Sequence, residues 1–382
     1  MGKKLRVGVI FGGRSGEHEV SIASAASVIA ALDKEKYEIV PIGVTHEGRW
    51  LAGVEPLRLT QGVSMEDDAA THTDVQAVTI TGDPTQRGLI PANPGADEEA
   101  GARVSRPFDI VLPVLHGTYG EDGALQGLLE MADVPYAGSG VLGAALGMDK
   151  EKAKMVFRSA GLPVVDWLIV RRREMERDPE AVAARIEARF SYPLFAKPVN
   201  LGSSVGVSKA HNHAELLDAL RLALEFDRRA IIEPGVTCRE LECAVLGNDE
   251  PQASVVGEVA PSREFYDYRA KYIDNTSRLF IPADIPAETS DAVRRMAVEA
   301  FLALDLCGLA RVDFFLDKES GAIYINEVNT MPGFTQISMY PKLWEASGVP
   351  YPELLDRLIQ LGLERHEERR RNRTTFDPDV EA

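Results

Sequence analysis

The chain opens with apolar runs that alternate with glycine-rich turns and helical patterns. Leu5 to Phe11 predicts a buried strand, Gly12 to Gly16 a turn, Glu19 to Leu32 a helix and Tyr37 to Val44 the next strand. Strand, turn, helix and strand in this order indicate a βαβ unit with a parallel sheet. We therefore expect an open α/β domain at the N-terminus.

The pattern changes in residues 51–106, where Pro, Gly, Thr and acidic residues dominate. Val75 to Ile80 is the one strand predicted there, so we expect an irregular elaboration. Phe108 to Leu115 then predicts another buried strand, which leads into the loop from His116 to Gly123. The same criteria predict helices at 124–131, 150–160, 180–189, 215–224 and 291–305, and strands at 163–170, 230–233 and 241–246.

Composition and charge narrow the class of protein. A net charge of −17 argues against nucleic acid and acidic membranes as partners, because both require a positive surface. Cys238, Cys243 and Cys307 are too few and too irregularly spaced for a disulfide framework or a metal site. No apolar run approaches the ~18 residues of a membrane span, and Val7 to Phe11 is too short for a signal peptide. We expect a cytoplasmic protein of two or three domains.

Charged residues gather near the C-terminus, where two apolar strands are predicted over residues 311–330. A three-residue loop that ends at a glycine would connect these strands. Asp313 then lies opposite Glu327, and Arg311 opposite Asn329. Because side chains alternate along a strand, all four share one face at one end of the hairpin.

This cluster has two interpretations. The oxygens of Asp313, Glu327 and Asn329 are the hard ligands that Mg²⁺ prefers. The alternative is an Arg–Asp–Glu ion-pair cluster at the end of a sheet. Residues 330–333, Thr-Met-Pro-Gly, break the strand directly after Asn329, so the cluster opens into a loop, where binding groups usually lie. We favour the metal site.

Glycine-rich loops follow two of the predicted N-terminal strands. Gly12 to Gly16 would place backbone N–H groups and a helix N-terminus at a strand's carboxyl end, a natural ligand position. Glu17 either belongs to that position or is a surface acid that complements the helix dipole, and the segment alone leaves both open. His116, after the second strand, is either a site residue or a hydrogen-bonded turn histidine, and we favour the site residue.

A second glycine-rich segment predicts a phosphate flap. Lys197 lies on a predicted strand that leads into Gly202 to Gly206, and small residues there let backbone amides approach a phosphate. The order differs from a Walker A loop, because the lysine precedes the glycines. A flexible hairpin tip is the alternative. Phe265 to Tyr272 predicts an aromatic and charged loop that closes over a ligand, or else a surface loop.

Gly138 to Gly143 matches GxGxxG, so a dinucleotide-binding oxidoreductase is a competing hypothesis. The match is weak, because no clear long strand precedes it and no acidic residue ends a strand about 20 residues later. We favour a domain junction here.

Seven segments, in this order, resemble the ATP-grasp superfamily and, within it, the D-alanine–D-alanine ligase family. They are GGRSGEHEVS (12–21), LHGTYGEDG (115–123), MDK (148–150), AKPVNLGSSVGVSK (196–209), FYDYRAKY (265–272), GLARVDFF (308–315) and NEVNTMPGFT (326–335). Most are weak singly, but as a set that spans nearly the whole chain they are highly specific.

The resemblance implies an α/β (α+β) fold of three domains, in which an open parallel α/β domain precedes a two-part ATP-grasp module with antiparallel sheets. We expect a substrate-binding domain at 1–138, a central subdomain with the flap at 139–233, a catalytic and metal-binding subdomain at 234–365, and a charged, solvated tail at 366–382. The family also implies a homodimer.

The implied reaction joins two D-alanines at the expense of ATP, for bacterial cell-wall precursor synthesis. One carboxylate attacks the γ-phosphate to give an acyl phosphate and ADP. The amine of the second D-alanine then displaces phosphate through a tetrahedral intermediate. D-Alanine and ATP are thus the expected small-molecule substrates.

The resemblance also assigns the phosphate and metal groups. Lys150 and Lys197 would bind the α- and β-phosphates, Gly202, Ser203, Ser204 and Val205 would cover the β- and γ-phosphates, and Lys271 would meet the transferred group. Glu327 and Asn329 would hold one Mg²⁺, and Asp313 with Glu327 a second, with Mn²⁺ as an alternative ion. Arg311 would stabilise the oxyanion.

The remaining assignments concern substrates. Glu17 would pair with the ammonium of the first D-alanine and would connect through Ser203 to Tyr272, and His116 would also lie in the substrate site. Gly333 and Ser338 would bind the carboxylate of the second D-alanine. Glu233, Pro234 and Val236 would hold adenine, and Glu240 the ribose. Pro234 departs from the family, where a lysine is common, so a side-chain donor is missing there.

Three alternatives share much of this pattern. The D-alanine–D-lactate ligases and other ATP-grasp carboxylate–amine ligases would use the same phosphate and metal residues. Tyr272, absent from the corresponding loop of the D-lactate enzymes, favours an amine as second substrate. A nucleotide-binding regulatory protein without catalysis would have little need of Arg311.

Overall fold

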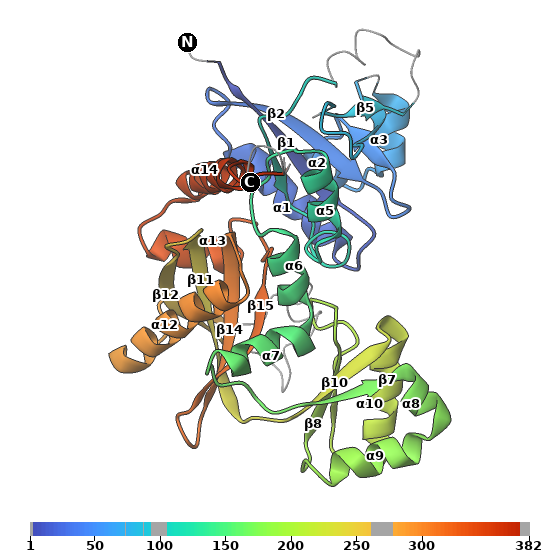
Figure 1. The fold of residues 1–382 in the computed structure, drawn as a ribbon, viewed down its shortest axis with the longest axis vertical. Coiled ribbons are helices and arrows are strands. Elements are labelled where there is room, and N and C mark those ends of the chain that lie inside the picture. The colour runs from blue at the N-terminus through green and yellow to red at the C-terminus, as the bar shows by residue number, and fades with distance from the viewer. Residues whose placement is uncertain (1–2, 73, 87, 93–104, 261–277, 375–382) are drawn as a thin grey trace, which may run out of the picture.

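The structure, a computed structural model, describes residues 3–72, 74–86, 88–92, 105–260 and 278–374. Its described part forms three β-sheets that follow one another along the chain, with helices packed against them (Figure 1). The first sheet has six strands, the second four and the third five. The predicted α/β (α+β) fold class is confirmed.

The first sheet has the strand order β5-β4-β3-β2-β1-β6, and β1 runs parallel to β2 and β6. Its strands are β1 (Leu5–Gly12), β2 (Tyr37–Val44), β3 (Trp50–Ala52), β4 (Gln76–Thr79), β5 (Ile90–Pro91) and β6 (Ile110–Pro113). Val9 and Phe11 of β1 pack in one core with α1 (His18–Ala31), whereas Ile10 packs in another with α5 (Ala124–Met131). Because both faces are covered, β1 is apolar without alternation.

The segment predicted to be irregular, 51–106, is more regular than expected in its described part. It contributes β4 and β5, most of β3, and two short helices, α2 (Pro56–Leu59) and α3 (Met65–Thr71). β3, β4 and β5 pair antiparallel, so the sheet is mixed rather than parallel throughout. Periodicity predicted only β4, because strands of two or three residues are too short to show alternation.

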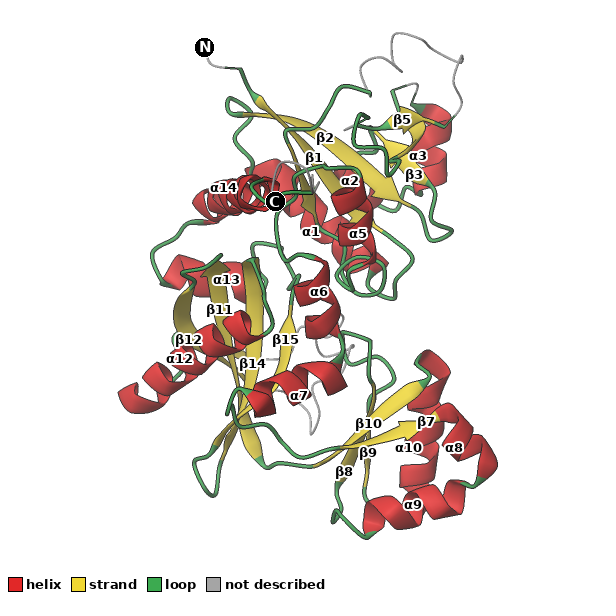
Figure 2. Cartoon of the chain, in the orientation of Figure 1, coloured by secondary structure: helices red, strands yellow, loops and turns green. Residues whose placement is uncertain are grey.

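The second sheet has the order β7-β10-β8-β9 with antiparallel neighbours. Its strands are β7 (Leu168–Arg171), β8 (Leu194–Pro198), β9 (Ser208–Ala210) and β10 (Arg229–Pro234), and its helices are α8 (Arg172–Arg177), α9 (Pro179–Glu187) and α10 (His213–Phe226) (Figure 2). Leu216 and Leu220 of α10 pack against Leu194 and Ala196 of β8 in a core that belongs to this sheet and its helices.

The third sheet is antiparallel, with the order β13-β12-β11-β14-β15. Its strands are β11 (Cys238–Gly247), β12 (Gln252–Ala260), β13 (Arg278–Phe280), β14 (Gly308–Asp317) and β15 (Ile323–Asn329). One face packs with α12 (Ala287–Ala303) and the other with α13 (Met339–Ala346). Helices α6 (Val141–Met148) and α7 (Lys150–Ser159) contact β15 and carry the chain from the first sheet to the second.

The last described helix, α14 (Tyr351–Arg370), returns to the first sheet and packs with α1, β6 and the third sheet. The prediction of a solvated tail from residue 366 is therefore wrong for its first residues. His366 is buried, and the guanidinium of Arg365 lies 4.1 Å from the ring centroid of Tyr136. The many charged residues of this stretch indicated a solvent-exposed end, but the apolar stems of charged side chains can pack, and α14 packs on the N-terminal sheet.

The competing hypothesis of a dinucleotide-binding fold can now be judged. The segment from Gly138 to Gly143 includes the start of α6, and the described residues directly before it form only an isolated bridge at Tyr136. The strand that a dinucleotide-binding fold places directly before this motif is therefore missing from the described chain. Among the described residues, no helix combines the length and apolar character that a membrane span requires. The predicted domain boundaries at 138 and 233 stay predictions.

Candidate active site

The hairpin of β14 and β15 pairs the predicted residues. Arg311 lies opposite Asn329 and Asp313 opposite Glu327, as expected. A β-bulge follows Asp313, so that Phe314 pairs with Ile325. The connecting loop has four residues rather than the three predicted, and the bulge restores the register at the site. The four polar side chains therefore share one face.

Arg311 joins two acidic side chains on this face. Its Nε lies 2.7 Å from Asp313 Oδ1 and 2.9 Å from Glu242 Oε2, and its Nη2 donates to Asp313 Oδ2 at 2.7 Å. Burial alone would lower the pKa of Arg311, but the charges of Asp313 and Glu242 raise it, so the guanidinium stays charged. The ion-pair interpretation therefore describes real contacts, yet the same contacts gather carboxylate oxygens at one point.

The donor set fits a divalent cation. Asn329 Nδ2 donates to Asp313 Oδ2 at 2.9 Å, so its Oδ1 is the atom that can meet a metal. Lys150 Nζ lies 3.2 Å from Glu327 Oε2. Lys150 and Arg311 thus offset the mutual repulsion of these two carboxylates. Two carboxylates and one amide oxygen are the ligand types that magnesium-like ions take.

The flap, residues 202–206, connects β8 to β9 and reaches the start of α1. Ser203 Oγ donates to Glu17 Oε1. Ser203 and Ser204 have φ of 50° and 58°, a left-handed conformation uncommon for residues other than glycine. At the base of the flap, Lys150 Nζ donates to the carbonyl of Leu201 at 2.8 Å. Lys150 therefore lies between the flap and the metal-ligand cluster, where phosphates would pass.

Glu17 lies in the interior of this junction and is 8% exposed. Glycines from two loops enclose its carboxylate. A Cβ at Gly117 would lie 2.7 Å from Glu17 Oε2, and a Cβ at Gly202 would lie 2.8 Å from the same atom. A side chain at either position would displace the Glu17 carboxylate, and the φ of 76° at Gly117 also favours glycine there. The surface-acid alternative for Glu17 is therefore wrong.

Glu233 at the end of β10 lies between two ammonium groups. It pairs with Lys154, and its Oε2 lies 2.6 Å from Lys197 Nζ. Burial alone would raise the pKa of Glu233, but the charges of Lys154 and Lys197 lower it to about 2. The carboxylate predicted to hold adenine thus pairs with two lysines here, and its adenine role stays a prediction.

The loop predicted to bind the second carboxylate precedes α13. A Cβ at Gly333 would lie 3.2 Å from Ser338 Oγ, so the two predicted residues are adjacent. Ser338 Oγ also lies 2.7 Å from Thr335 Oγ1 and accepts from the backbone N–H of Thr335. The helix that begins at Met339 adds the partial positive charge of its N-terminus, which favours a carboxylate.

His116 is buried, and both of its ring nitrogens have partners. Nδ1 lies 2.8 Å from the carbonyl oxygen of Met331 and Nε2 lies 3.0 Å from Ser24 Oγ. Because a carbonyl only accepts, Nδ1 donates and Nε2 accepts from the serine. Burial lowers the pKa of His116 although Glu17 opposes this, in keeping with a neutral ring. The ring is thus hydrogen-bonded as the turn-histidine alternative expects, and a place for His116 in the substrate site stays a prediction.

Sequence reasoning missed Lys154, Glu242 and Glu121. Lys154 follows Lys150 by one helical turn, and Glu242 follows Glu240 by two residues on a strand, so both share a face with a predicted residue. Such spacing is also typical of solvated faces, and only burial distinguishes the two cases. Nothing in the sequence distinguished Glu121 from the rest of the loop between His116 and Gly123. Burial, reinforced by the charge of Glu17, raises the pKa of Glu121 to about 7.

The remaining predicted residues are less informative. Lys271 and Tyr272 lie outside the described residues. Pro234 ends β10, and Val236 and Glu240 lie half-buried on the connection to β11 and on β11 itself. The described groups nevertheless form one continuous site, with a buried acid, a flap, two lysines, an oxygen cluster and a helix N-terminus. Such a site can bind a nucleotide triphosphate beside an amino acid and stabilise a developing oxyanion.

Comparisons with known proteins agree with this chemistry. A family model described as D-ala D-ala ligase N-terminus matches residues 6–139, and one described as D-ala D-ala ligase C-terminus matches residues 156–360. The D-alanine–D-alanine ligase of Acetivibrio thermocellus is 50% identical over 371 residues, which cover 96% of this chain and 98% of that protein. That of Heliobacterium modesticaldum is 50% identical over 374 residues, which cover 97% and 98%.

Two solved structures share the architecture. The D-alanine–D-alanine ligase of Coxiella burnetii has a TM-score of 0.83 at 37% identity and covers 97% of each chain. The VanG D-Ala:D-Ser ligase of Enterococcus faecalis has a TM-score of 0.82 at 36% identity, with 94% of this chain and 100% of that chain covered.

Replacement of Glu233 by glutamine tests the buried charge triplet. Glu233→Gln leaves two buried ammonium groups unpaired, so we expect a loss of about 3–5 kcal/mol in the free energy of unfolding near neutral pH. Because the folded-state pKa lies below the unfolded one, the advantage of the wild type is present above pH 4.5. It shrinks by about 1.4 kcal/mol per pH unit as the pH falls towards 2.

Urea denaturation at several pH values between 7 and 3 would measure this difference. Glu353→Gln is the matched control, because Glu353 forms an exposed pair with Arg357 on α14 and should change stability by less than about 0.5 kcal/mol. A difference between wild type and Glu233→Gln that does not vary with pH would contradict the assignment.

Proposed function

The chain belongs to the D-alanine–D-alanine ligase family, and from that membership we propose that it joins two D-alanines into D-alanyl-D-alanine for peptidoglycan precursor synthesis. The observation that carries the proposal is the face of Arg311, Asp313, Glu327 and Asn329, with Lys150 linking it to the flap. An oxyanion donor beside metal-type ligands serves catalysis rather than nucleotide binding alone.

The reaction has two steps. A carboxylate oxygen of the first D-alanine bonds to the γ-phosphorus of ATP, and the bond from that phosphorus to the β,γ-bridging oxygen breaks, which releases ADP. The amine nitrogen of the second D-alanine then attacks the acyl carbon and loses a proton. Phosphate leaves with the electrons of its bond to carbon, and an amide remains.

Lysines and the flap position the phosphates. Lys150 and Lys197 meet the α- and β-phosphates as point charges, and the backbone of the flap residues Gly202, Ser203, Ser204 and Val205 covers the β- and γ-phosphates. Lys271 meets the transferred phosphoryl group. Closure of the flap through Ser203 and Glu17 excludes water, which would otherwise hydrolyse the acyl phosphate.

The family uses ATP with divalent metal ions, and we propose two Mg²⁺ ions, with Mn²⁺ as an alternative. Glu327 and Asn329 would hold one ion, and Asp313 with Glu327 the other. When bound, the ions neutralise charge on the phosphates as ADP leaves. Arg311, held by Asp313 and by Glu242 of the neighbouring strand β11, stabilises the oxyanion of the tetrahedral intermediate.

Glu17 would receive the ammonium of the first D-alanine, and Gly333 with Ser338 the carboxylate of the second. Tyr272 would connect to this network through Ser203. Glu233, Pro234 and Val236 would meet adenine mainly through the backbone, and Glu240 the ribose. A homodimer in the cytoplasm completes the proposal.

D-Serine is the competing second substrate, because a D-Ala:D-Ser ligase shares 36% identity and nearly the whole architecture. D-Lactate is a further alternative, disfavoured by Tyr272. These substrates differ only at the second position, so they share every proposed phosphate and metal residue.

Substrate choice can be measured by phosphate release from Mg·ATP, with product identification by mass spectrometry. We expect release with D-alanine and none with L-alanine. Equimolar D-serine or D-lactate added to D-alanine should leave D-alanyl-D-alanine as the main product. A dominant mixed product would assign the alternative substrate, and silence with D-alanine would contradict the proposed function.

Glu327→Gln tests the metal assignment. Loss of a carboxylate shared by both proposed ions should lower kcat/KM by at least about 10²-fold and raise the Mg²⁺ concentration needed for half-maximal activity. Glu319→Gln, in the exposed turn of the same hairpin, is the control and should behave as wild type. Near-normal activity of Glu327→Gln would refute the metal site.

Arg311→Met tests the oxyanion role. Removal of one such donor typically lowers kcat by about 10²–10³-fold, and we expect this with a KM for ATP within about threefold of wild type. Because Arg311 is buried between two acids, a melting curve should accompany the kinetics. A raised KM for ATP with unchanged kcat would remove the oxyanion role.

A further inference from the structure

The loop that carries the proposed second-carboxylate site, residues 330–336, is held by side chains from the N-terminal part of the chain. Met331 is bonded at both backbone groups. Its N–H donates to Glu121 Oε2 at 3.0 Å, and its carbonyl accepts from His116 Nδ1 at 2.8 Å. Glu121 and His116 belong to the same loop, residues 116–123, so this loop holds both the N–H and the carbonyl group of Met331.

Two serines of α1 continue this arrangement. Phe334 N–H donates to Ser24 Oγ at 3.3 Å, and Gln336 N–H donates to Ser27 Oγ at 3.2 Å. Pro332 has no N–H, and among the described residues the N–H of Gly333 has no hydrogen-bond acceptor. The chain is therefore anchored at Met331 and at Phe334, on either side of Gly333, whose N–H the proposed substrate carboxylate would use.

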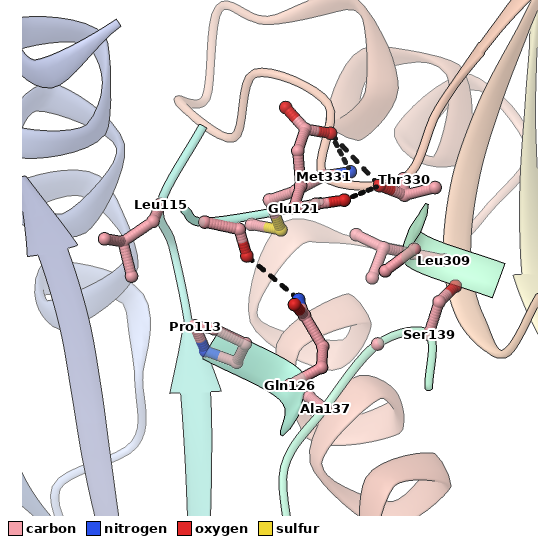
Figure 3. Close-up of a pocket in the computed structure, with 12 residues that line it drawn as sticks. Pro113, Leu115, Glu121, Gln126, Ala137, Ser139, Leu309, Thr330 and Met331 are labelled. Atoms are coloured by element: carbon pink, nitrogen blue, oxygen red, sulfur yellow. Dashed lines mark hydrogen bonds between the residues drawn. The ribbon is translucent and has the colours of Figure 1, made fainter. Parts of the chain in front are cut away.

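Glu121 is the most connected of these anchors. Its Oε1 accepts from the N–H of Gly117 at 2.8 Å, and its Oε2 also accepts from Thr330 Oγ1 at 3.1 Å. Figure 3 shows one oxygen of its carboxylate hydrogen-bonded to both Thr330 and Met331, at a small cavity lined also by Gln126, Ser139 and Leu309. Gly117 in turn touches Glu17, so one carboxylate connects the loops of both proposed amino-acid subsites.

We infer that Glu121 is a positioning residue for the second amino acid: it fixes the Met331 peptide so that Gly333 and Ser338 present their donors to the incoming carboxylate. The inference rests on the proposed function. The effect should fall on the second subsite, because Gly117 keeps two other bonds, to the backbone N–H groups of Gly120 and Glu121, when the carboxylate is lost. Within the described part of the chain, by contrast, Glu121 is the only acceptor for the Met331 N–H.

Glu121→Gln is the direct test, since an amide nitrogen must then face one of the N–H groups that the carboxylate accepts from. Hydrogen exchange of the peptide that covers 330–336 should become at least tenfold faster. The KM for the second D-alanine should rise at least tenfold, while the KM values for ATP and for the first D-alanine stay within about threefold.

Two further variants separate positioning from general damage. Glu130→Gln removes a half-buried acid that joins α5 to α14 through Arg365 and does not contact the loop, so exchange in 330–336 should stay as in wild type. Ser24→Ala removes the acceptor of Phe334 N–H and should raise the same KM more modestly. If Glu121→Gln folds poorly, Ser24→Ala still tests whether anchoring of residues 330–336 sets the KM for the second D-alanine.

The outcomes are distinct. Unchanged exchange in 330–336 for both Glu121→Gln and Ser24→Ala would overturn the inference. Faster exchange with equal rises in both D-alanine KM values, or with a fall in kcat alone, would also overturn it. If the wild type makes no D-alanyl dipeptide, the proposed function fails, while the exchange data still decide whether Glu121 holds the loop.

Discussion

The site depends on the antiparallel register of β14 and β15. Asp313 and Glu327 are opposite each other, and Arg311 and Asn329 are opposite each other, on one face. A slip of one residue would send these side chains into the apolar core beneath α12, where an unpaired charge is costly. The bulge after Asp313 is what reconciles this register with the four-residue turn at the far end of the hairpin.

Charge balance around that register explains how so many acidic and basic side chains stay close together. Five carboxylates of the site each have a cationic or hydrogen-bond-donating neighbour: Arg311 for Asp313 and Glu242, Lys150 for Glu327, two lysines for Glu233, and Ser203 for Glu17. The positive groups that would meet phosphates are thus already ordered by fixed acids. Binding therefore exchanges partners within a rigid frame, and little side-chain entropy remains to be lost.

The sequence alone predicted the parts of this site that depend on local spacing. The alternation of Arg311, Asp313, Glu327 and Asn329 and the glycines around Ser203 were visible because strand period and turn chemistry are local. The role of His116 and the existence of Glu121, Glu242 and Lys154 as site residues were not, because burial and contacts between residues distant in sequence decide them. In the same way, α14 looked solvated until its packing partner, the N-terminal sheet, was known.

The apolar cores have a mechanical consequence. Residues of the first and third sheets share one core with α13 and α14, whereas the sheet that carries the flap has a separate core. Moving the flap-bearing sheet breaks polar contacts such as Ser203–Glu17, which water can replace, but parting the other two sheets would expose buried apolar surface. The flap-bearing sheet and its helices can therefore move as a unit, while the first and third sheets stay packed together. Such a movement would let the nucleotide exchange beneath the flap. The two proposed amino-acid subsites lie on the part that shares one core, so their spacing stays the same from one turnover to the next.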